Sequence, residues 1–183
     1  LSLSSNSIRL NMLQLILGGA RSGKSRLAEQ TAKESGLSVV YIATAQALDE
    51  EMQQRIQHHQ QQRPSHWQLC EEPIFLADQL LQLDQENQLI LVDCLTLWLT
   101  NLLLAEDTAL QQQQTEKLLK VLPQLKSDII LVSNETGLGV VPMGEISRRF
   151  VDEAGRLHQA LGQLADKVVF CVAGFPMILK GEK

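Results

Sequence analysis

Short apolar runs alternate along the chain with longer stretches in which apolar residues recur every three to four positions. Five of the short runs predict buried β-strands, at Leu13–Leu17, Val39–Thr44, Leu89–Asp93, Asp128–Ser133 and Lys167–Val172. The longer stretches predict helices, at Ser25–Ser35, Asp49–Gln62, Ile74–Leu83, Thr108–Leu122 and Glu145–Leu164. Strands that alternate with helices form right-handed crossovers, so the pattern predicts an α/β fold with a mainly parallel sheet flanked by helices.

Length and composition are ordinary for a globular domain. The chain has 183 residues, of which 44% are hydrophobic and 20% charged, enough for one buried core. Residues 1–11 are polar and Ser-rich, and we expect them to be a disordered extension. We expect residues 12–183 to form a single nucleotide-binding catalytic domain.

Charge and cysteine content narrow the function classes. The formal net charge of -5 argues against a general nucleic-acid binder, which needs a basic surface. No apolar run approaches the roughly 20 residues that span a bilayer, so we expect no membrane span. Cys70, Cys94 and Cys171 are too far apart for a zinc site or a disulfide framework, which favours a cytoplasmic location.

The strongest motif directly follows the first predicted strand. Gly18-x-x-x-x-Gly23-Lys24-Ser25 lies between a strand and a helix, the context in which this spacing forms a P-loop. The glycines let backbone N–H groups approach phosphate oxygens, and the helix N-terminus adds a positive dipole end. We expect Lys24 to reach the β- and γ-phosphates of ATP or GTP, and Ser25 to offer its hydroxyl to Mg²⁺.

An acidic residue ends the third predicted strand. In P-loop proteins an apolar strand that ends in a carboxylate delivers that group beside the phosphates. Asp93 is therefore expected to hold Mg²⁺ directly or through water, and the alternative is an Asp that caps the following helix.

A histidine pair stands in the polar segment 49–62. If this segment is helical, Arg55 and His59 share a face, with Arg63 one turn further on. A neighbouring arginine lowers the pKa of a histidine and keeps the ring neutral and nucleophilic. A solvated polar helix is the alternative, and the residues alone favour it over a catalytic site.

Several further features carry weaker expectations. Residues 133–142 follow a predicted strand and suit a substrate loop, although a plain connecting loop fits almost as well. The cluster Gln111–Gln114 is interpreted as solvated helix surface. His66 and His158 have no visible partner in the sequence.

Four segments, taken in order, resemble the bifunctional adenosylcobinamide kinase / adenosylcobinamide-phosphate guanylyltransferase family of cobalamin biosynthesis. They are GGARSGKS, YIATAQALDEEMQQRIQHHQQQRPSHW, LILVDCLTLWLTNLL and VSNETGLGVVP. The P-loop is common to many families. The elements R-I-x-x-H followed by R-P and W, and N-E-x-G-x-G-x-V-P, are far more specific.

The resemblance implies two reactions on a corrinoid substrate. The first phosphorylates adenosylcobinamide with ATP or GTP, and the second transfers GMP from GTP to adenosylcobinamide phosphate, giving adenosylcobinamide-GDP. It implies a guanylyl-histidine intermediate at His59, with His58 as the adjacent alternative, a RecA-like P-loop sheet and a homotrimer. For that homotrimer we expect part of the apolar run Leu97–Leu104, or its surroundings, to lie between subunits.

The resemblance also maps the family's nucleotide contacts onto this chain. They fall on Gly18, Gly19, Ala20, Arg21, Ser22, Gly23, Lys24, Ser25, Thr44, Ala45, Gln46, Gln60, Gln61, Gln62, Arg63, Glu71 and Asp93. Relatives often have a basic residue where this chain has Gln60. Two other functions stay open at this point: a plain P-loop small-molecule kinase without guanylyl transfer, and a nucleotide-gated binding or regulatory protein.

Overall fold

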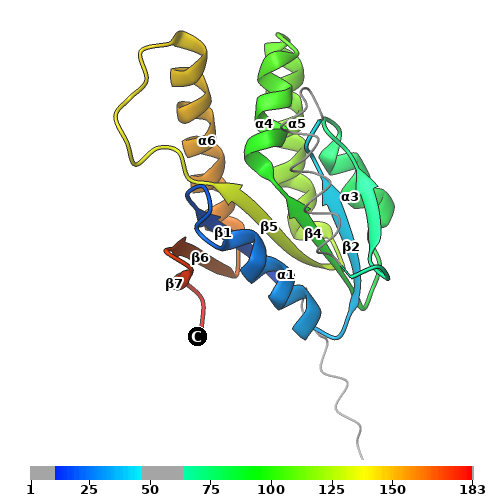
Figure 1. The fold of residues 1–183 in the computed structure, drawn as a ribbon. Helices are drawn as coiled ribbons and strands as arrows, with labels where there is room; N and C mark the ends of the chain where they lie inside the picture. Colours follow the sequence, from blue (N-terminus) through cyan, green and yellow to red (C-terminus); the bar gives the residue numbers. More distant parts are fainter. Residues whose placement is uncertain (1–10, 47–63, 183) are drawn as a thin grey trace, which may run out of the picture.

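The computed structural model describes residues 11–46 and 64–182, and its strands form one seven-stranded sheet (Figure 1). The strands are β1 (Leu13–Gly18), β2 (Ser38–Ala43), β3 (Gln68–Glu71), β4 (Gln88–Asp93), β5 (Asp128–Asn134), β6 (Lys167–Val172) and β7 (Phe175–Lys180). Their order across the sheet is β3-β2-β4-β5-β1-β6-β7. All neighbours are parallel except β7, which pairs antiparallel with β6.

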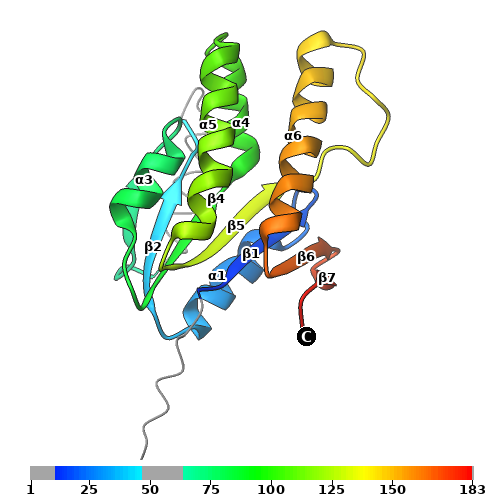
Figure 2. The ribbon, with the colours of Figure 1, turned by 180° about the vertical axis from the view of Figure 1, so that it is seen from behind.

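The described helices cover the two faces of the sheet unequally (Figures 1 and 2). The described helices are α1 (Lys24–Glu34), α3 (Leu76–Leu83), α4 (Leu95–Leu104), α5 (Thr108–Val121) and α6 (Glu145–Leu164), with a 3-10 turn at Leu122–Gln124. On one face α1 contacts β1, β4 and β5, and the other four helices pack on the opposite face and on one another. None of these helices combines the length and the apolar character needed to cross a membrane.

Alternation along the strands gives each face its own apolar core. On β1, Leu15 lies in the core under α3 to α6, whereas Ile16 lies in the core under α1. On β4 and β5, Leu91 and Val132 likewise belong to the α1 core, whereas Ile90, Val92 and Leu131 belong to the other. This alternation is the period of two expected for strands whose two faces are both covered.

The polar residues that end these strands continue the same alternation. Asp93 comes two residues after Leu91, and Asn134 two residues after Val132, so both continue the series that faces α1. Ser133 continues the series that faces α6. Asp93 and Asn134 therefore point to the face that carries α1, and Ser133 points to the face that carries α6.

The five predicted strands and four of the predicted helices are confirmed, with boundaries that differ by up to two residues. The fifth predicted helix, Asp49–Gln62, lies outside the described residues. The pattern missed β3, β7 and α4. β3 and β7 are edge strands with exposed residues, and α4 has seven of its ten residues buried, so its apolar run has no polar face to mark a helical period.

The interpretation of Gln111–Gln114 as solvated surface is wrong for two of the four glutamines. Gln111 and Gln114 are only 5% and 3% exposed, because they lie on the stripe of α5 that also buries Leu118. The Oε1 of Gln111 accepts a hydrogen bond of 2.7 Å from Arg149 of α6. This polar contact ties α5 to α6 above the sheet.

Most of the apolar run Leu97–Leu104 is buried inside the chain itself. Its apolar members with less than a tenth of their surface exposed are Trp98, Leu99, Leu102 and Leu103. The Nε1–H of Trp98 donates to the carbonyl of Ile74 at 2.8 Å, which anchors α4 to the start of α3. Those four residues therefore cannot be the subunit contact that we expected, and Leu104, 53% exposed, is the main part of the run that remains accessible.

Candidate nucleotide site

The motif Gly18–Ser25 forms a loop from β1 into α1, as predicted. Gly23 caps the N-terminus of α1 with φ of 94°, a left-handed conformation that favours glycine. No side chain caps this helix, so its first backbone N–H groups face the loop. Such N–H groups and the helix dipole are what a phosphate needs.

Close packing also restricts the first glycine of the loop. A Cβ atom at Gly18 would lie 2.4 Å from the Oγ of Ser22 and 2.7 Å from the carbonyl oxygen of Cys171. The loop therefore closes over its own first residue. The Oγ of Ser22 is buried and has no hydrogen-bond partner within the described part of the chain.

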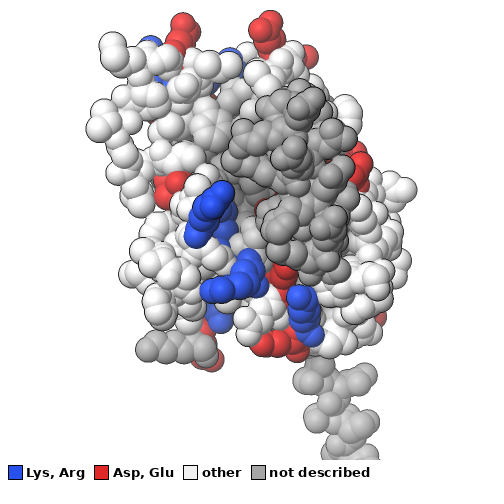
Figure 3. All heavy atoms as spheres, in the orientation of Figure 1, with Lys and Arg blue, Asp and Glu red and all other residues white. Residues whose placement is uncertain are grey.

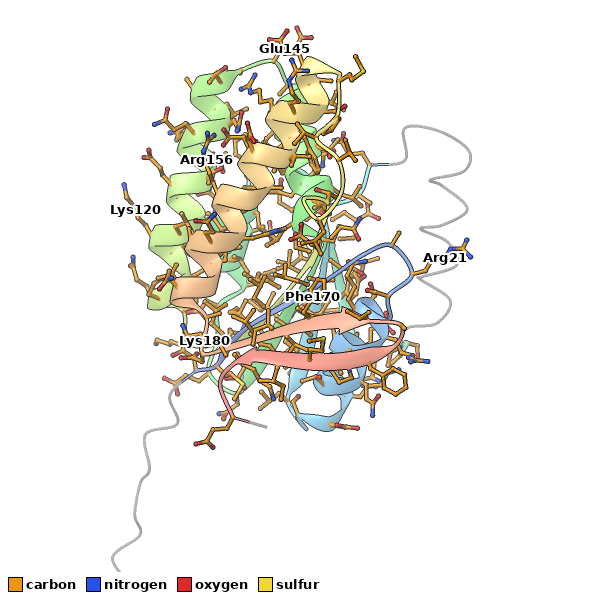
Figure 4. All side chains as sticks on the ribbon, turned by 90° about the vertical axis from the view of Figure 1, so that its left-hand side faces the viewer. Arg21, Lys120, Glu145, Arg156, Phe170 and Lys180 are labelled. Carbon is orange, nitrogen blue, oxygen red and sulfur yellow. The ribbon has the colours of Figure 1, made fainter. Side chains whose placement is uncertain are left out.

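Lys24 lies across the mouth of the loop. Its Nζ donates a hydrogen bond of 3.0 Å to the carbonyl oxygen of Gly19. Its charge also acts on two thiols: burial raises the pKa of Cys94 and of Cys171, and the Lys24 ammonium works against that rise in both. The ammonium is thus close to the ends of both β4 and β6. Arg21, at the outer tip of the loop, is exposed and points away from the sheet (Figure 4).

The β6–β7 hairpin supports the loop from behind. The N–H of Gly174, in the hairpin turn, donates to the carbonyl of Ser22 at 3.0 Å. A Cβ atom at Gly23 would lie 3.2 Å from the Cα of Gly174. At the far end of the hairpin, the Nζ of Lys180 donates to the carbonyls of Gly162 and Gln163 near the C-terminus of α6 (Figure 4).

Asp93 ends β4 on the same face as α1. Its Oδ2 accepts a hydrogen bond of 2.8 Å from the hydroxyl of Tyr41, and the residue is half-buried. Since β5 alone separates β4 from β1, Asp93 and the P-loop are brought to neighbouring positions on the carboxyl edge. The structure thus places together the two elements that the sequence predicted to share a phosphate site.

Thr44 has a structural connection that the sequence did not indicate. Its Oγ1 donates to the carbonyl of Cys94 at 2.7 Å and accepts from the N–H of the same residue at 3.0 Å. Asn101 of α4 donates to the carbonyl of Thr44 at 2.8 Å. The side chain of Thr44 is therefore occupied in joining β2 to the β4–α4 junction, and Gln46, which is exposed, is more accessible to a ligand.

Glu71 lies at the other end of the carboxyl edge. It is the last residue of β3 and pairs in register with Ala43 of β2. Three strands stand between β3 and β1, which corresponds to roughly 19 Å between Glu71 and the P-loop at ordinary strand spacing. Glu71 and Lys24 are thus separate parts of an extended edge.

The predicted catalytic histidine falls on a segment that the structure does not describe. His59, its neighbour His58, Arg55, the contacts Gln60–Gln62 and Arg63 all lie outside the described residues. Their roles remain predictions from the sequence. The described residues contain no cluster of three or more His, Cys, Asp or Glu that could hold a metal ion.

A buried polar cluster at the end of β5 was missed by the sequence reasoning. The Nε2 of His158, on α6, lies 2.7 Å from the Oγ of Ser133, and its Nδ1 lies 3.5 Å from the Oε2 of Glu135. Burial lowers the pKa of His158, against the opposing effect of the Glu135 carboxylate, so the ring is neutral at pH 7. A neutral ring with its hydrogen on Nδ1 accepts the hydroxyl hydrogen of Ser133.

Glu135 also connects this cluster to the P-loop. Its backbone N–H donates to the carbonyl of Gly18 at 3.0 Å, and its Oε1 accepts from the N–H of Gly137 at 2.5 Å. His158 could have been noticed from its place on the buried stripe of α6, between Leu157 and Leu161. A neutral polar residue on a buried stripe requires hydrogen-bond partners.

Basic side chains stand along the face that carries α1, with acidic side chains close beside them (Figure 3). Basic side chains thus gather on this face although the net charge of the whole chain is -5. A face of this kind can attract a polyphosphate without making the protein basic overall.

The sequence matches the model of one protein family and several curated proteins. The family is described as cobinamide kinase / cobinamide phosphate guanyltransferase, and its model matches residues 14–179. Bifunctional adenosylcobalamin biosynthesis protein CobP of Pseudomonas aeruginosa is 61% identical, over 93% of this chain and 99% of that protein. The proteins named CobU of Escherichia coli and Salmonella typhimurium are 38% and 39% identical, each over 92% of this chain and 100% of theirs.

The fold is also found in more distant solved structures. The RadB recombinase superposes with a TM-score of 0.52 at 19% identity, over 87% of this chain and 73% of that one. A protein of Pyrococcus horikoshii gives a TM-score of 0.55 at 11% identity, over 96% and 89%. At such identities the likeness concerns the fold alone, which is a RecA-like P-loop sheet. The chain itself belongs to the cobinamide kinase / cobinamide phosphate guanyltransferase family, the bifunctional transferases of cobalamin biosynthesis.

Proposed function

We propose that this chain phosphorylates adenosylcobinamide with ATP or GTP and then transfers GMP from GTP to the product through a guanylyl-histidine at His59. The observation that carries the phosphoryl transfer is the P-loop with Lys24 across its mouth and Asp93 on the neighbouring edge. The two reactions give adenosylcobinamide-GDP as the final product and pyrophosphate as the leaving group of the second step.

In the kinase reaction the chain supplies positioning and positive charge. The uncapped N–H groups of α1 bind phosphate oxygens, and Lys24 exchanges its bond to Gly19 for the β- and γ-phosphates. The corrinoid hydroxyl oxygen forms a bond to the γ-phosphorus while the bond from that phosphorus to the bridging oxygen breaks. The hydroxyl proton leaves to solvent.

The described residues fit a magnesium ion carried by the nucleotide. Ser25 and Asp93 offer a hydroxyl and a carboxylate oxygen, the donor type that Mg²⁺ prefers, and one or two protein ligands are usual when phosphates complete the shell. We propose that these two residues hold the ion. When bound, Mg²⁺ neutralises charge that develops on the leaving phosphate oxygens.

For guanylyl transfer we propose a neutral imidazole of His59 as the nucleophile. Its nitrogen forms a bond to the α-phosphorus of GTP while pyrophosphate leaves. The phosphate of the corrinoid then displaces the histidine, so one difficult displacement becomes two easier ones. We propose Thr44, Ala45, Gln46, Gln60, Gln61, Gln62, Arg63, Glu71 and the P-loop as the nucleotide contacts.

The intermediate can be tested by intact mass after incubation with GTP and Mg²⁺. We expect one added GMP that survives alkali and is lost in acid, because protonation makes the phosphoramidate nitrogen a good leaving group. His59→Ala should abolish the label and retain phosphorylation of adenosylcobinamide by ATP, since that reaction uses no protein nucleophile.

His58→Ala is the matched control, in which we expect normal labelling. Labelling lost only in His58→Ala would move the nucleophile to the adjacent ring. Labelling unaffected in both variants would overturn the histidine mechanism, and a parent protein that takes up no GMP would indicate a plain kinase. Nucleotide hydrolysis with no modified corrinoid would indicate a nucleotide-gated regulatory protein.

We also propose that the protein is a homotrimer whose contacts involve residues 138–146. This segment, which runs from the loop after β5 into the first turn of α6, carries large exposed apolar side chains, at Leu138, Val140, Val141, Met143 and Ile146. Val140 and Met143 are 97% and 95% exposed. Exposed apolar side chains gathered in this way mark interaction surfaces.

A further inference from the structure

We propose that Asn134 contacts the transferring phosphoryl group in the kinase reaction, and that Ser133, His158 and Glu135 are positioning residues that hold it there. This inference rests on the proposed kinase function of the P-loop. It adds Asn134 to the P-loop motif and to Asp93 at the end of β4 as a residue of the phosphate site. Three independent features of the described residues support it.

The first feature is the position of β5 in the sheet. β5 lies between β4 and β1, so its carboxyl end stands between Asp93 and the P-loop. Asn134 pairs in register with Gly18, the first residue of the P-loop. In parallel sheets ligands bind outside the carboxyl ends of the strands, and Asn134 occupies the central one of three such ends.

The second feature is the side chain of Asn134, both the face to which it points and the lack of a hydrogen-bond partner for its Oδ1 among the described residues. Asn134 continues the series of Ile130 and Val132, which face the core under α1, and α1 carries the P-loop at its N-terminus. Its Oδ1 is buried and has no hydrogen-bond partner among the described residues. A buried amide oxygen without a partner is costly, and a ligand that supplies the partner removes that cost.

The third feature is the anchoring of both neighbours of Asn134. Ser133 points to the opposite face of the sheet, where its Oγ lies 2.7 Å from His158. Glu135 is held by Gly18, Gly137 and His158. The backbone N–H of Asn134 also approaches the Oγ1 of Thr96 at 3.4 Å. Asn134 is therefore fixed on each side, while its Oδ1 has no partner among the described residues.

An amide in this position can serve both reacting groups. Its N–H₂ group donates to an oxygen of the γ-phosphoryl group, and its carbonyl accepts from the attacking hydroxyl. The P-loop cradles the β-phosphate, so the group that extends from there toward Asp93 is the γ-phosphoryl. Guanylyl transfer takes place at the α-phosphorus, on the other side of the β-phosphate, and should depend less on Asn134.

Kinetics of both half-reactions test the role of Asn134. In Asn134→Ala we expect kcat for phosphorylation of adenosylcobinamide to fall by roughly 100-fold, as when one donor to a developing oxyanion is removed. The Kd for nucleotide should change by less than about threefold, and formation of adenosylcobinamide-GDP from adenosylcobinamide phosphate and GTP should be retained. Gln113→Ala removes an exposed amide on α5 and is the matched control, with unchanged rates.

Two results would overturn the role of Asn134. One is a kinase kcat within twofold of the parent at saturating substrates. The other is an equal loss of both activities together with nucleotide binding, which would indicate a structural role. A Lys24→Ala variant measured in parallel separates these results from a failure of the P-loop assignment, because that variant should lose both activities.

The positioning residues are tested by a pair of substitutions at His158. His158→Phe removes both polar contacts and should lower the kinase kcat by roughly 10-fold with little change in nucleotide Kd. His158→Gln retains a donor and an acceptor and should recover most of that loss. Should His158→Phe fail to fold, Ser133→Ala removes one contact and should lower the same kcat. Equal rates in the parent, His158→Phe and Ser133→Ala would refute the positioning role.

Discussion

At the scale of single residues, we propose that Lys24 takes part in both reactions. Its ammonium spans the P-loop to Gly19 at 3.0 Å and is placed to follow the phosphates. We expect Lys24→Ala to lower kcat for both reactions by roughly 100- to 1,000-fold, since a charge that stabilises the transition state is removed. Steady-state assays at saturating nucleotide measure this.

Lys33→Ala is the control for that measurement, because Lys33 is exposed in the last turn of the same helix. Its rates should equal those of the parent. Near-normal turnover in Lys24→Ala would show that Gly18–Ser25 does not serve as the phosphate site.

His158 should make the stability of the protein sensitive to mild acid. Burial lowers its pKa in the folded state. As the pH falls below about 6.5, the ordinary pKa of histidine, the unfolded chain binds a proton that the folded chain does not. The free energy of unfolding therefore decreases until the pH reaches the lowered folded-state pKa.

His158→Gln removes this contribution. Its Tm should fall less between about pH 7.5 and pH 5 than the Tm of the parent, as measured by thermal melting. His66→Gln alters an exposed histidine and should keep the profile of the parent. If parent and His158→Gln lose Tm equally over this range, the buried ring is not responsible.

At the scale of elements, central and edge parts of the sheet differ in how well the sequence predicted them. β1, β2, β4, β5 and β6 are apolar runs covered on both faces, and their composition alone marks them. β3 has no fully buried residue, so nothing in its composition separates it from a loop. Gln111 and Gln114 were misjudged because burial on α5 depends on the helices packed against it, α3, α4 and α6, which no local pattern shows.

The same distinction applies to the candidate site. The P-loop and Asp93 could be predicted because each is a local motif at the end of an apolar strand. The partners of His158 could not, since Ser133 and Glu135 belong to β5 and its loop while His158 belongs to α6. Only the packing of α6 against the sheet brings them together.

Within the P-loop, substitution by alanine should cost more stability at Gly18 than at Gly19. In Gly18→Ala the new Cβ would meet Ser22 and Cys171 at 2.4 and 2.7 Å, so the loop or β6 must shift. We expect a loss of about 1–3 kcal/mol in the free energy of unfolding, measured by denaturant titration without nucleotide.

Gly19→Ala is the matched control, because a Cβ there meets nothing within 4 Å. Its free energy of unfolding should stay within about 0.5 kcal/mol of the parent, as for open surface positions. Equal stability of the two variants would mean that the loop does not close over Gly18 in solution.

For the whole molecule, the exposed apolar segment 138–146 leads to a prediction about assembly. We expect light scattering at micromolar concentration to give the mass of a trimer. The double variant Val140→Ser with Met143→Ser should weaken that association, because it removes two fully exposed apolar side chains. Leu104→Ser alters an exposed apolar residue on α4 and serves as the control.

A monomer at micromolar concentration would contradict the trimer. A trimer unaffected by Val140→Ser with Met143→Ser, and disrupted by Leu104→Ser, would move the contact to the end of α4. Neither outcome bears on the nucleotide site, which is tested by the kinetic assays described above.

The hairpin of β6 and β7 has a consequence for biosynthesis on the ribosome. Gly174 supports Ser22 and Gly23 from a turn that is translated about 150 residues after the phosphate loop. A nascent chain arrested before that turn would carry the motif without its support. Affinity for nucleotide should therefore appear only after β6 and β7 have left the exit tunnel, rather than when the motif itself emerges.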